Sequence, residues 1–298
     1  MADPTILYIT SFNRSGSTLL GMLLGRQSSI TFVGEIRNLN DHVVRRKVCY
    51  CGSVFHRCPF WSSVIEKAAL DVMGYETKTE ASVGQKLVKY ASVSKLAMRI
   101  LERFKFLWKG VGKEIEVREN ILDMYRIVAK HCSAPVICDS SKLISQAKLM
   151  WMRYGERFKI IHLVRDGRGV ANSVMKRTDC SIEEAARSWR KNNLFSLVAQ
   201  REIPTENLLR LRYEDICRNT ANEIAKVCEF AMVNFSESDF VSKGNALHFV
   251  GGSPTAKKNK VEDMAIECDE KWKDELSCEE KRRFERIAGS VNRLYGYS

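Results

Sequence analysis

Short runs of β-branched and apolar residues alternate along the chain with longer stretches in which apolar residues recur at helical spacing. The short runs predict strands at residues 6–10, 135–138, 158–164 and 208–213. The helical spacing predicts helices at residues 18–24, 142–152, 170–177 and 215–230. This alternation predicts an α/β fold in which a mostly parallel central sheet is flanked by helices.

Two more helix starts are predicted by capping boxes, in which Ser181 pairs with Glu184 and Ser277 pairs with Glu280. Between about residues 61 and 131 no strand pattern occurs, and apolar residues fall at helical spacing. We expect a helical insertion there. A packed layer is the simpler interpretation of its apolar stripe, and a lid is the alternative.

The composition is that of a globular protein, with 298 residues and 45% hydrophobic content. No apolar stretch is long enough to span a membrane, and no secretory signal precedes the first strand. Ten cysteines are scattered along the chain, which favours free thiols in a reducing compartment. We therefore expect a cytoplasmic protein, although length alone leaves the number of domains open.

Basic residues outnumber acidic ones by 48 to 36, which gives a formal net charge of +12. Such a charge favours an anionic ligand, but it also suits nucleic acid or a membrane surface. The chain contains neither a recognisable nucleic-acid-reading motif nor a basic stretch interleaved with aromatic residues. We therefore expect no nucleic-acid partner.

A candidate anion site follows the first predicted strand, where a short loop leads into an apolar helix. Backbone N–H groups at a helix start attract anions, glycine permits a close approach, and hydroxyl groups add donors. We expect a phosphate to be bound by Arg14, Ser15, Gly16, Ser17, Thr18 and Leu19. The simplest non-functional interpretation is a serine-rich helix cap.

The same loop departs from the nucleotide-triphosphate motif GxxxxGK[ST]. Ser11 stands where the first glycine belongs, and Ser17 stands where the lysine belongs. The missing lysine argues against a kinase or ATPase, while Arg14 supplies a cation. A P-loop nucleotide-dependent small-molecule kinase remains the alternative, and it would use Asp139 as a magnesium ligand.

A resemblance to one family rests on this loop and on residues 160–173, which read IIHLVRDGRGVANS. The two segments are similar to the 5′-phosphosulfate loop and the 3′-phosphate segment of sulfotransferases that use 3′-phosphoadenosine-5′-phosphosulfate (PAPS). The bacterial-type and tyrosylprotein-sulfotransferase-like branch is the most similar. The resemblance implies the P-loop-like sulfotransferase fold, with Arg165 and Ser173 binding the 3′-phosphate. Arginine suits this role because its planar fork can bind a phosphate through two hydrogen bonds.

Two later segments extend the resemblance over nearly the whole chain, which implies one sulfotransferase domain over residues 1–298. Residues 211–215, LRYED, are similar to a family strand and imply a nucleotide contact for Tyr213. Residues 248–254, HFVGGSP, are similar to the late loop that folds over the nucleotide, and they imply contacts from Gly252 and Ser253. Related chains often carry an arginine after that proline.

In this chain the positive charge after the late loop comes from lysines. Lys257 and Lys258 are therefore candidates to contact the 3′-phosphate. A solvated lysine run is the alternative interpretation, because charge runs usually face water.

The resemblance also implies catalytic residues. Glu35 lies in VGEIR, which is similar to the segment that supplies a catalytic glutamate in protein-tyrosine and several bacterial sulfotransferases. We expect it to be the general base, although a glutamate that complements a helix dipole is the alternative. Lys142, in CDSSK, is the candidate that stabilises the leaving group. His162 is expected to be a buried strand residue.

The activity implied is in-line transfer of a sulfuryl group from PAPS to an acceptor hydroxyl, with release of 3′-phosphoadenosine 5′-phosphate (PAP). We expect a small-molecule acceptor. The motifs leave open whether it is an alcohol, phenol, sugar or amine, and they leave the oligomeric state unknown.

A cysteine-rich segment could supply four zinc ligands within ten residues, namely Cys49, Cys51, His56 and Cys58. The spacing is tight for one closed site. Similar segments ending in Cys-Pro-Phe-Trp occur in bacterial-type relatives. We therefore expect local cysteine packing and no metal, with zinc as the alternative.

Overall fold

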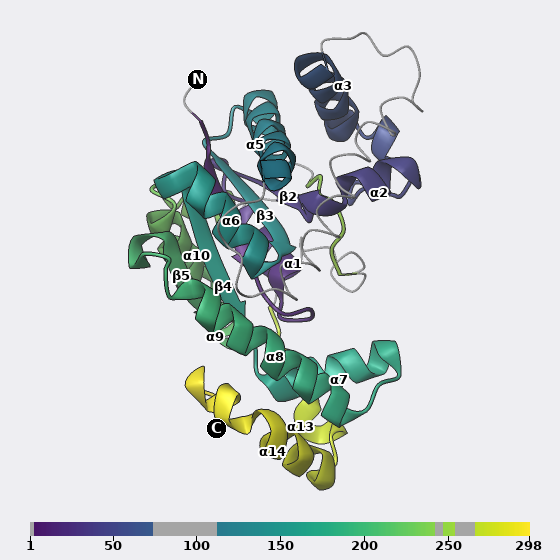
Figure 1. Cartoon of the computed structure of the whole chain (residues 1–298), viewed down its shortest axis with the longest axis vertical. Helices are drawn as coiled ribbons and strands as arrows, with labels where there is room; N and C mark the ends of the chain where they lie inside the picture. The colour runs from purple at the N-terminus through teal and green to yellow at the C-terminus, as the bar shows by residue number, and fades with distance from the viewer. Residues whose placement is uncertain (1–2, 74–111, 242–246, 254–265) are drawn as a thin grey trace.

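A five-stranded parallel sheet forms the centre of the computed structural model, which describes residues 3–73, 112–241, 247–253 and 266–298 (Figure 1). The strand order is β2-β3-β1-β4-β5, and every neighbouring pair is parallel. The strands are β1 (Thr5–Thr10), β2 (Ile30–Gly34), β3 (Val136–Lys142), β4 (Phe158–Val164) and β5 (Leu208–Arg212). The predicted α/β fold with a parallel sheet is confirmed.

Side chains of alternate strand residues enter separate apolar clusters on the two faces of the sheet, because successive residues of a strand point to opposite sides. In β1, Ile6 and Tyr8 join one cluster, while Leu7 and Ile9 join the other. Helices cover both faces. They shield the apolar strands from water, as parallel sheets require.

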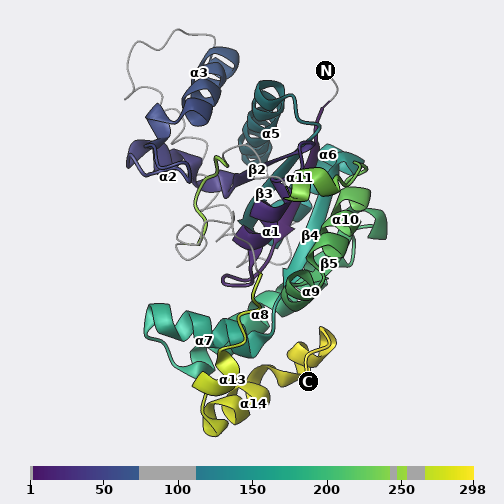
Figure 2. The same cartoon turned by 180° about the vertical axis from the view of Figure 1, so that it is seen from behind.

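On the first face lie α3 (Pro59–Met73), α5 (Gly112–Cys132) and α6 (Ile144–Tyr154), and α5 and α6 cross the sheet in Figure 1. On the opposite face lie α1 (Ser17–Leu24) and α10 (Thr220–Phe230), seen in front in Figure 2. A third apolar cluster joins α7 (Gly167–Thr178), α8 (Ile182–Gln200) and α14 (Cys278–Leu294). No helix among the described residues has the length and apolar character needed to cross a membrane.

Short helices complete the chain. They are η1 (Ile36–Asn38), α2 (Leu39–Val44), η2 (Phe55–Arg57), η3 (Gly155–Arg157), η4 (Thr205–Asn207), α9 (Tyr213–Arg218), α11 (Glu237–Val241) and α13 (Trp272–Glu275). Both predicted capping boxes form, at the starts of α8 and α14. The predicted insertion is helical in α3 and α5, and its central residues, 74–111, lie outside the described part.

Several predicted boundaries differ from those of the structure, and two of the differences have a clear physical reason. The helix expected over residues 215–230 is divided into α9 and α10, because Asn219 has a non-helical backbone conformation. The helix expected from residue 142 begins at Ile144, because Lys142 still belongs to β3. The Lys142 carbonyl accepts hydrogen bonds from Thr10 Oγ1 (2.9 Å) and from the Ser11 N–H (3.3 Å), which extends the contact between the two strands.

The close packing of α1 on β2 generates a stability prediction. Gly21, in the middle of α1, has no room for a side chain, because an added Cβ would overlap the ring of the buried Phe32. We expect Gly21→Ala to lower the free energy of unfolding by about 1–3 kcal/mol, the usual result of overpacking, although alanine favours helix formation. Urea denaturation measures the change.

The matched control is Gly289→Ala, in the middle of α14. There an added Cβ would meet only the movable carboxylate end of Glu285 as its nearest neighbour. This variant should be as stable as the parent chain or more stable by up to about 1 kcal/mol. Equal effects of the two substitutions would contradict the packing argument.

Candidate functional site

The loop between β1 and α1 has the geometry of an anion site. Gly16 adopts a left-handed conformation with φ of 92°, and an added Cβ would lie 2.5 Å from the Tyr213 ring, so only glycine fits. Gly16 provides no side-chain cap for α1, whose first N–H groups also lack intrahelical partners. Ser11 Oγ is buried, and among the described residues it has no hydrogen-bond partner. These donors are arranged to receive an anion.

The expected phosphate-loop residues lie together at this position. Ser15, Ser17 and Thr18 are buried, and the side chain of Leu19 packs against the core. Any contact of Leu19 with an anion would therefore use its backbone N–H, as in other helix N-termini.

Arg14 connects the phosphate loop to two segments that are distant in sequence. Its Nε donates to Ser173 Oγ at 2.9 Å, and one terminal nitrogen donates to Ser253 Oγ at 3.0 Å. Burial, together with the nearby cations Arg177 and Arg165, lowers the pKa of Arg14. The three guanidinium groups therefore create a positive potential that favours an anionic ligand.

Arg165 follows β4 and its side chain is only 7% exposed. It donates to the Arg14 carbonyl at 3.1 Å and lies over the Tyr213 ring, 4.6 Å from the centroid. Its other terminal nitrogen donates to the Asp269 carboxylate at 3.0 Å. Asp269 was not predicted from the sequence, because it comes from a segment without a recognisable motif.

The late loop reaches the site through backbone pairing with the end of β2. The Val250 N–H donates to the Val33 carbonyl at 2.9 Å, and the Glu35 N–H donates to the Val250 carbonyl at 2.8 Å. Further along, the Ser253 N–H donates to Thr18 Oγ1 at 3.1 Å. The late loop therefore contacts both β2 and the phosphate loop.

The two predicted nucleotide contacts in the late loop are close to the phosphate loop. Ser253 bonds to Arg14 and Thr18, and an added Cβ on Gly252 would lie 3.2 Å from the Thr18 side chain. Lys257 and Lys258 lie outside the described residues, so their predicted contacts stay predictions.

The two expected catalytic residues form an ion pair with each other. Lys142 Nζ donates to Glu35 Oε1, and the second oxygen, Oε2, accepts from Asn38 Nδ2 at 2.8 Å. The two side chains are 15% and 13% exposed, respectively. β2 and β3 are neighbours in the sheet, which places the end of one strand beside the end of the other.

Arg37 is a further cation beside this pair. One terminal nitrogen of its guanidinium lies 3.9 Å from Glu35 Oε2, and its buried Nε has no hydrogen-bond partner among the described residues. Arg37 belongs to the VGEIR segment, but no role was predicted for it from the sequence. Its position after a strand end was the only signal in the sequence.

Asp139 is completely buried in β3. Its Oδ2 accepts from the Tyr125 hydroxyl at 2.5 Å, and its Oδ1 accepts from the Ser141 N–H at 2.6 Å. Burial raises the pKa of Asp139 to about 6. Because both oxygens already accept hydrogen bonds inside the protein, Asp139 is poorly placed to bind magnesium, which weakens the kinase alternative.

Two of the histidines are buried. His162 is buried in β4, as expected, and burial lowers its pKa to about 3. His42 is also buried, and its Nδ1 lies 3.0 Å from the Asn38 carbonyl.

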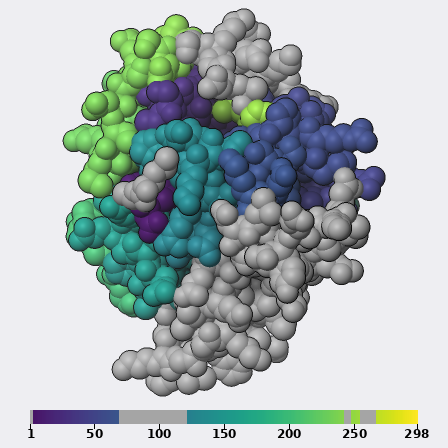
Figure 3. Space-filling view, turned by 90° about the horizontal axis from the view of Figure 1, so that it is seen from above, coloured from purple at the N-terminus to yellow at the C-terminus, as the bar shows by residue number. Residues whose placement is uncertain are grey.

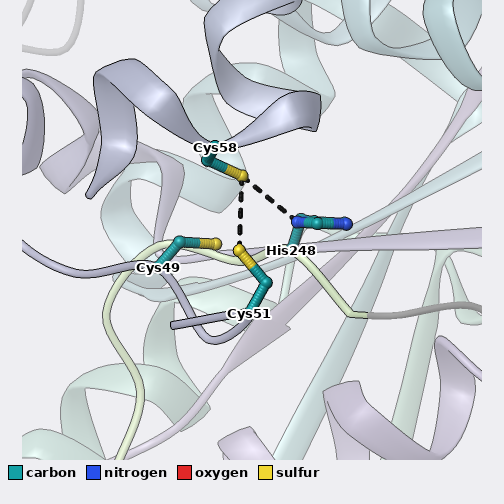
Figure 4. A group of neighbouring side chains, drawn as sticks. All are labelled: Cys49, Cys51, Cys58 and His248. Carbon is teal, nitrogen blue, oxygen red and sulfur yellow. Dashed lines mark hydrogen bonds between the residues drawn. The ribbon is translucent and has the colours of Figure 1, made fainter. Parts of the chain in front are cut away.

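Three of the four suggested zinc ligands do come together, but the fourth was misassigned. Cys49, Cys51 and Cys58 form one group with His248 of the late loop, and His56 is outside this group (Figure 4). His56 is near the cysteines in sequence, whereas His248 reaches them through the fold.

Comparison with known proteins supports the resemblance that the sequence motifs indicated. Residues 115–237 match the model of the sulfotransferase family, a segment that includes Lys142, Arg165, Ser173 and Tyr213. No curated protein matches the sequence.

Solved structures with a similar fold are sulfotransferases. The sulfotransferase domain of the Synechococcus olefin synthase is 18% identical, with a TM-score of 0.58, over 100% of this chain and 97% of that chain. The sulfotransferase domain from the curacin biosynthetic pathway is 19% identical, with a TM-score of 0.54, over 99% and 98%. A sulfotransferase from Mycobacterium avium is 11% identical, with a TM-score of 0.55, over 100% and 78%. At these identities the likeness shows a shared fold.

Asp139 generates a prediction about pH. Its pKa of about 6 in the folded chain exceeds the ordinary value of 3.8, so the folded state holds the proton more tightly. Stability should therefore fall as pH rises from about 4 to 6, by at most about 3 kcal/mol. Asp139→Asn removes this loss. We expect the variant to gain stability relative to the parent between pH 4 and pH 7, as measured by urea denaturation.

The control is Asp41→Asn on α2. A hydrogen bond from Lys47 lowers the pKa of Asp41, so this variant should gain nothing relative to the parent over the same pH range. If the stability difference between the parent and Asp139→Asn were constant with pH, Asp139 would have an ordinary pKa in the folded chain.

Proposed function

Because residues 115–237 match the sulfotransferase family model and the fold is similar to that of solved sulfotransferases, we propose that this chain transfers a sulfuryl group from PAPS to an acceptor hydroxyl and releases PAP. The convergence at Arg14 carries the proposal. This residue lies in the segment expected to bind the 5′-phosphosulfate, and it bonds to Ser173 in the segment expected to bind the 3′-phosphate. One nucleotide carrying both groups fits such an arrangement.

In the proposed complex, the first turn of α1 and the loop hydroxyls bind the 5′-phosphosulfate. Arg165 and Ser173 bind the 3′-phosphate, and Arg165 then exchanges its contact with Asp269 for the ligand. Burial would raise the pKa of Asp269, but the Arg165 guanidinium holds it below the ordinary value. The Asp269 carboxylate therefore occupies the Arg165 guanidinium group that would otherwise bind the 3′-phosphate.

We assign the chemical step to Glu35 and Lys142. As the acceptor oxygen bonds to sulfur and the bond from sulfur to the phosphate oxygen breaks, Glu35 takes the proton of the acceptor hydroxyl. Negative charge then develops on the departing phosphate oxygen, and the Lys142 ammonium stabilises it. Movement of the ammonium toward that oxygen frees a Glu35 carboxylate oxygen to accept the proton.

Three broader features complete the proposal. We propose that residues 1–298 form one sulfotransferase domain, since apolar clusters on both faces share a single sheet. A small-molecule acceptor hydroxyl is proposed, because no nucleic-acid-reading motif accompanies the basic charge. The ten scattered cysteines support a cytoplasmic location.

Ligand-dependent melting tests the proposal. PAP should raise the melting temperature of the chain, and ATP with magnesium should not, because a ligand that binds only the folded state stabilises it. Calorimetry should then show that Arg165→Ala weakens PAP binding by about 1.5–3 kcal/mol, which is roughly tenfold or more. Ser173→Ala should weaken it less, because it removes only a neutral hydroxyl.

The matched control is Arg210→Ala on the neighbouring strand β5. Arg210 also lies over an aromatic ring, that of Tyr295, but it is exposed and away from the anion site. PAP affinity should be unchanged in this variant. Stabilisation by ATP with magnesium in place of PAP would favour the kinase alternative, and parental PAP affinity in Arg165→Ala would contradict the 3′-phosphate assignment.

The role of Glu35 gives a kinetic prediction. Glu35→Gln keeps the shape and most hydrogen bonding but cannot take a proton, so turnover should fall by roughly 10²–10⁴-fold. PAP affinity should barely change. Turnover is measured with labelled PAPS and fractionated metabolite extract, by mass spectrometry for the gain of one sulfuryl group.

Asp41→Asn serves as the matched control, because it also removes a carboxylate from an ion pair with lysine, but on the exposed part of α2. Its turnover should equal that of the parent. Near-parental turnover in Glu35→Gln would leave Glu35 with only a dipole-complementing role.

A further inference from the structure

Four potential metal ligands gather where the late loop meets the cysteine-rich segment. Ligand atoms of Cys49, Cys51, Cys58 and His248 all lie within 4.8 Å of one another. Cys51 Sγ is 3.7 Å from Cys58 Sγ, and Cys58 Sγ is 3.2 Å from His248 Nδ1 (Figure 4). Figure 4 shows the three sulfurs and the imidazole ring directed toward a common point.

These separations agree with a tetrahedral zinc site. Zinc bonds to sulfur at about 2.3 Å and to nitrogen at about 2.0–2.1 Å, so tetrahedral angles place two sulfurs about 3.8 Å apart and sulfur about 3.5 Å from nitrogen. The distance between Cys51 Sγ and Cys58 Sγ matches the sulfur–sulfur value. A bound ion would require only a small increase in the distance between Cys58 Sγ and His248 Nδ1, which is 3.2 Å. Three thiolates and one imidazole form a set typical of structural zinc.

The backbone around the cysteines is also shaped for this role. Residues 48–54 form a tight hairpin, closed by the bridge between Val48 and Val54, and Gly52 turns the chain with φ of 91°. No atom lies within 4 Å of a Cβ added at Gly52, so glycine is needed for the turn rather than for space. We call residues 48–54 the cysteine hairpin. Cys58 follows it, at the start of α3.

The three sulfurs lie in a part of the fold that is largely shielded from water. Cys49 and Cys58 are buried, and Cys51 is half-buried. The cysteine hairpin and the residue before α3 therefore present three sulfur ligands from an enclosed position.

The ring of His248 is held in place by stacking. It is half-buried and lies against the Phe60 ring, with centroids 5.4 Å apart and planes 3° from parallel. Its Nδ1 lies 3.2 Å from Cys58 Sγ, so this ring nitrogen faces the cysteines.

We propose that Cys49, Cys51, Cys58 and His248 bind a structural Zn²⁺ ion that fastens the late loop to the cysteine hairpin. This reverses our sequence-based expectation of simple cysteine packing, because His248 completes a closed site that neighbouring residues in the sequence could not. Because four protein ligands would fill a tetrahedral site, the ion would have no open position for a substrate.

The position of His248 gives the ion a structural consequence. The next residue, Phe249, is fully buried and stacks on Tyr50 of the cysteine hairpin, with centroids 4.8 Å apart. Val250 then pairs with Glu35, and Ser253 bonds to Thr18. In Figure 3, segment 247–253 (yellow-green) is visible between the purple N-terminal segment and the blue segment that contains α2 and α3. Zinc would thus fix one end of a loop whose other end contacts the anion site.

Metal analysis of the full chain, purified with reductant and dialysed, tests the proposal. The parent should hold about one zinc per chain, and Cys51→Ser, Cys58→Ser and His248→Gln should each lose most of it. The matched controls are His56→Gln and Cys278→Ser, which alter a nearby histidine and an exposed cysteine outside the group. Both should keep parental zinc, and loss of zinc in His56→Gln but not in His248→Gln would overturn the assignment.

Cobalt substitution of the parent decides the matter even if the variants fail to fold. Co²⁺ should replace zinc and give the visible bands of tetrahedral coordination with a thiolate charge-transfer band. Removal of the metal should also lower the melting temperature, since a bound ion stabilises only the folded state. Zinc far below one equivalent after incubation with Zn²⁺, with no cobalt bands, or a Cys51–Cys58 disulfide instead of bound metal, would overturn the proposal.

Discussion

The parallel alignment of five strands is the constraint on which the site depends. All strands of such a sheet end at the same edge, so each loop that leaves a strand emerges there. The phosphate loop follows β1, Glu35 follows β2, Lys142 ends β3 and Arg165 follows β4. Residues that are more than a hundred positions apart in sequence are therefore neighbours, with no need for a long connecting loop.

Much of this arrangement could be predicted from the sequence, because strand and helix patterns are local. The β-branched runs and the capping boxes identified the elements, and the phosphate loop was visible as a strand followed by a glycine-containing turn. The ion pair between Glu35 and Lys142 could not be predicted from local patterns. It depends on β2 lying beside β3, and strand order is decided by packing of the whole chain.

The histidine of the cysteine group shows the same limit. His56 was suggested because it is close in sequence, whereas His248 arrives through pairing of the late loop with β2. That pairing also explains Gly34, where an added Cβ would overlap the Val250 backbone and φ is 74°. The backbone of Glu35 and the late loop therefore form one unit, and a change that displaces either would displace the other.

Lys142 shows how stability and chemistry can conflict at one position. Its φ of 73° lies in the left-handed region, which disfavours side chains other than glycine and asparagine. Hydrogen bonds from Thr10 and Ser11 to its carbonyl hold this conformation. A glycine here would relax the backbone but would remove the ammonium group. Backbone strain at this position is therefore offset by the contacts of the Lys142 carbonyl and by the ion pair of its ammonium group with Glu35.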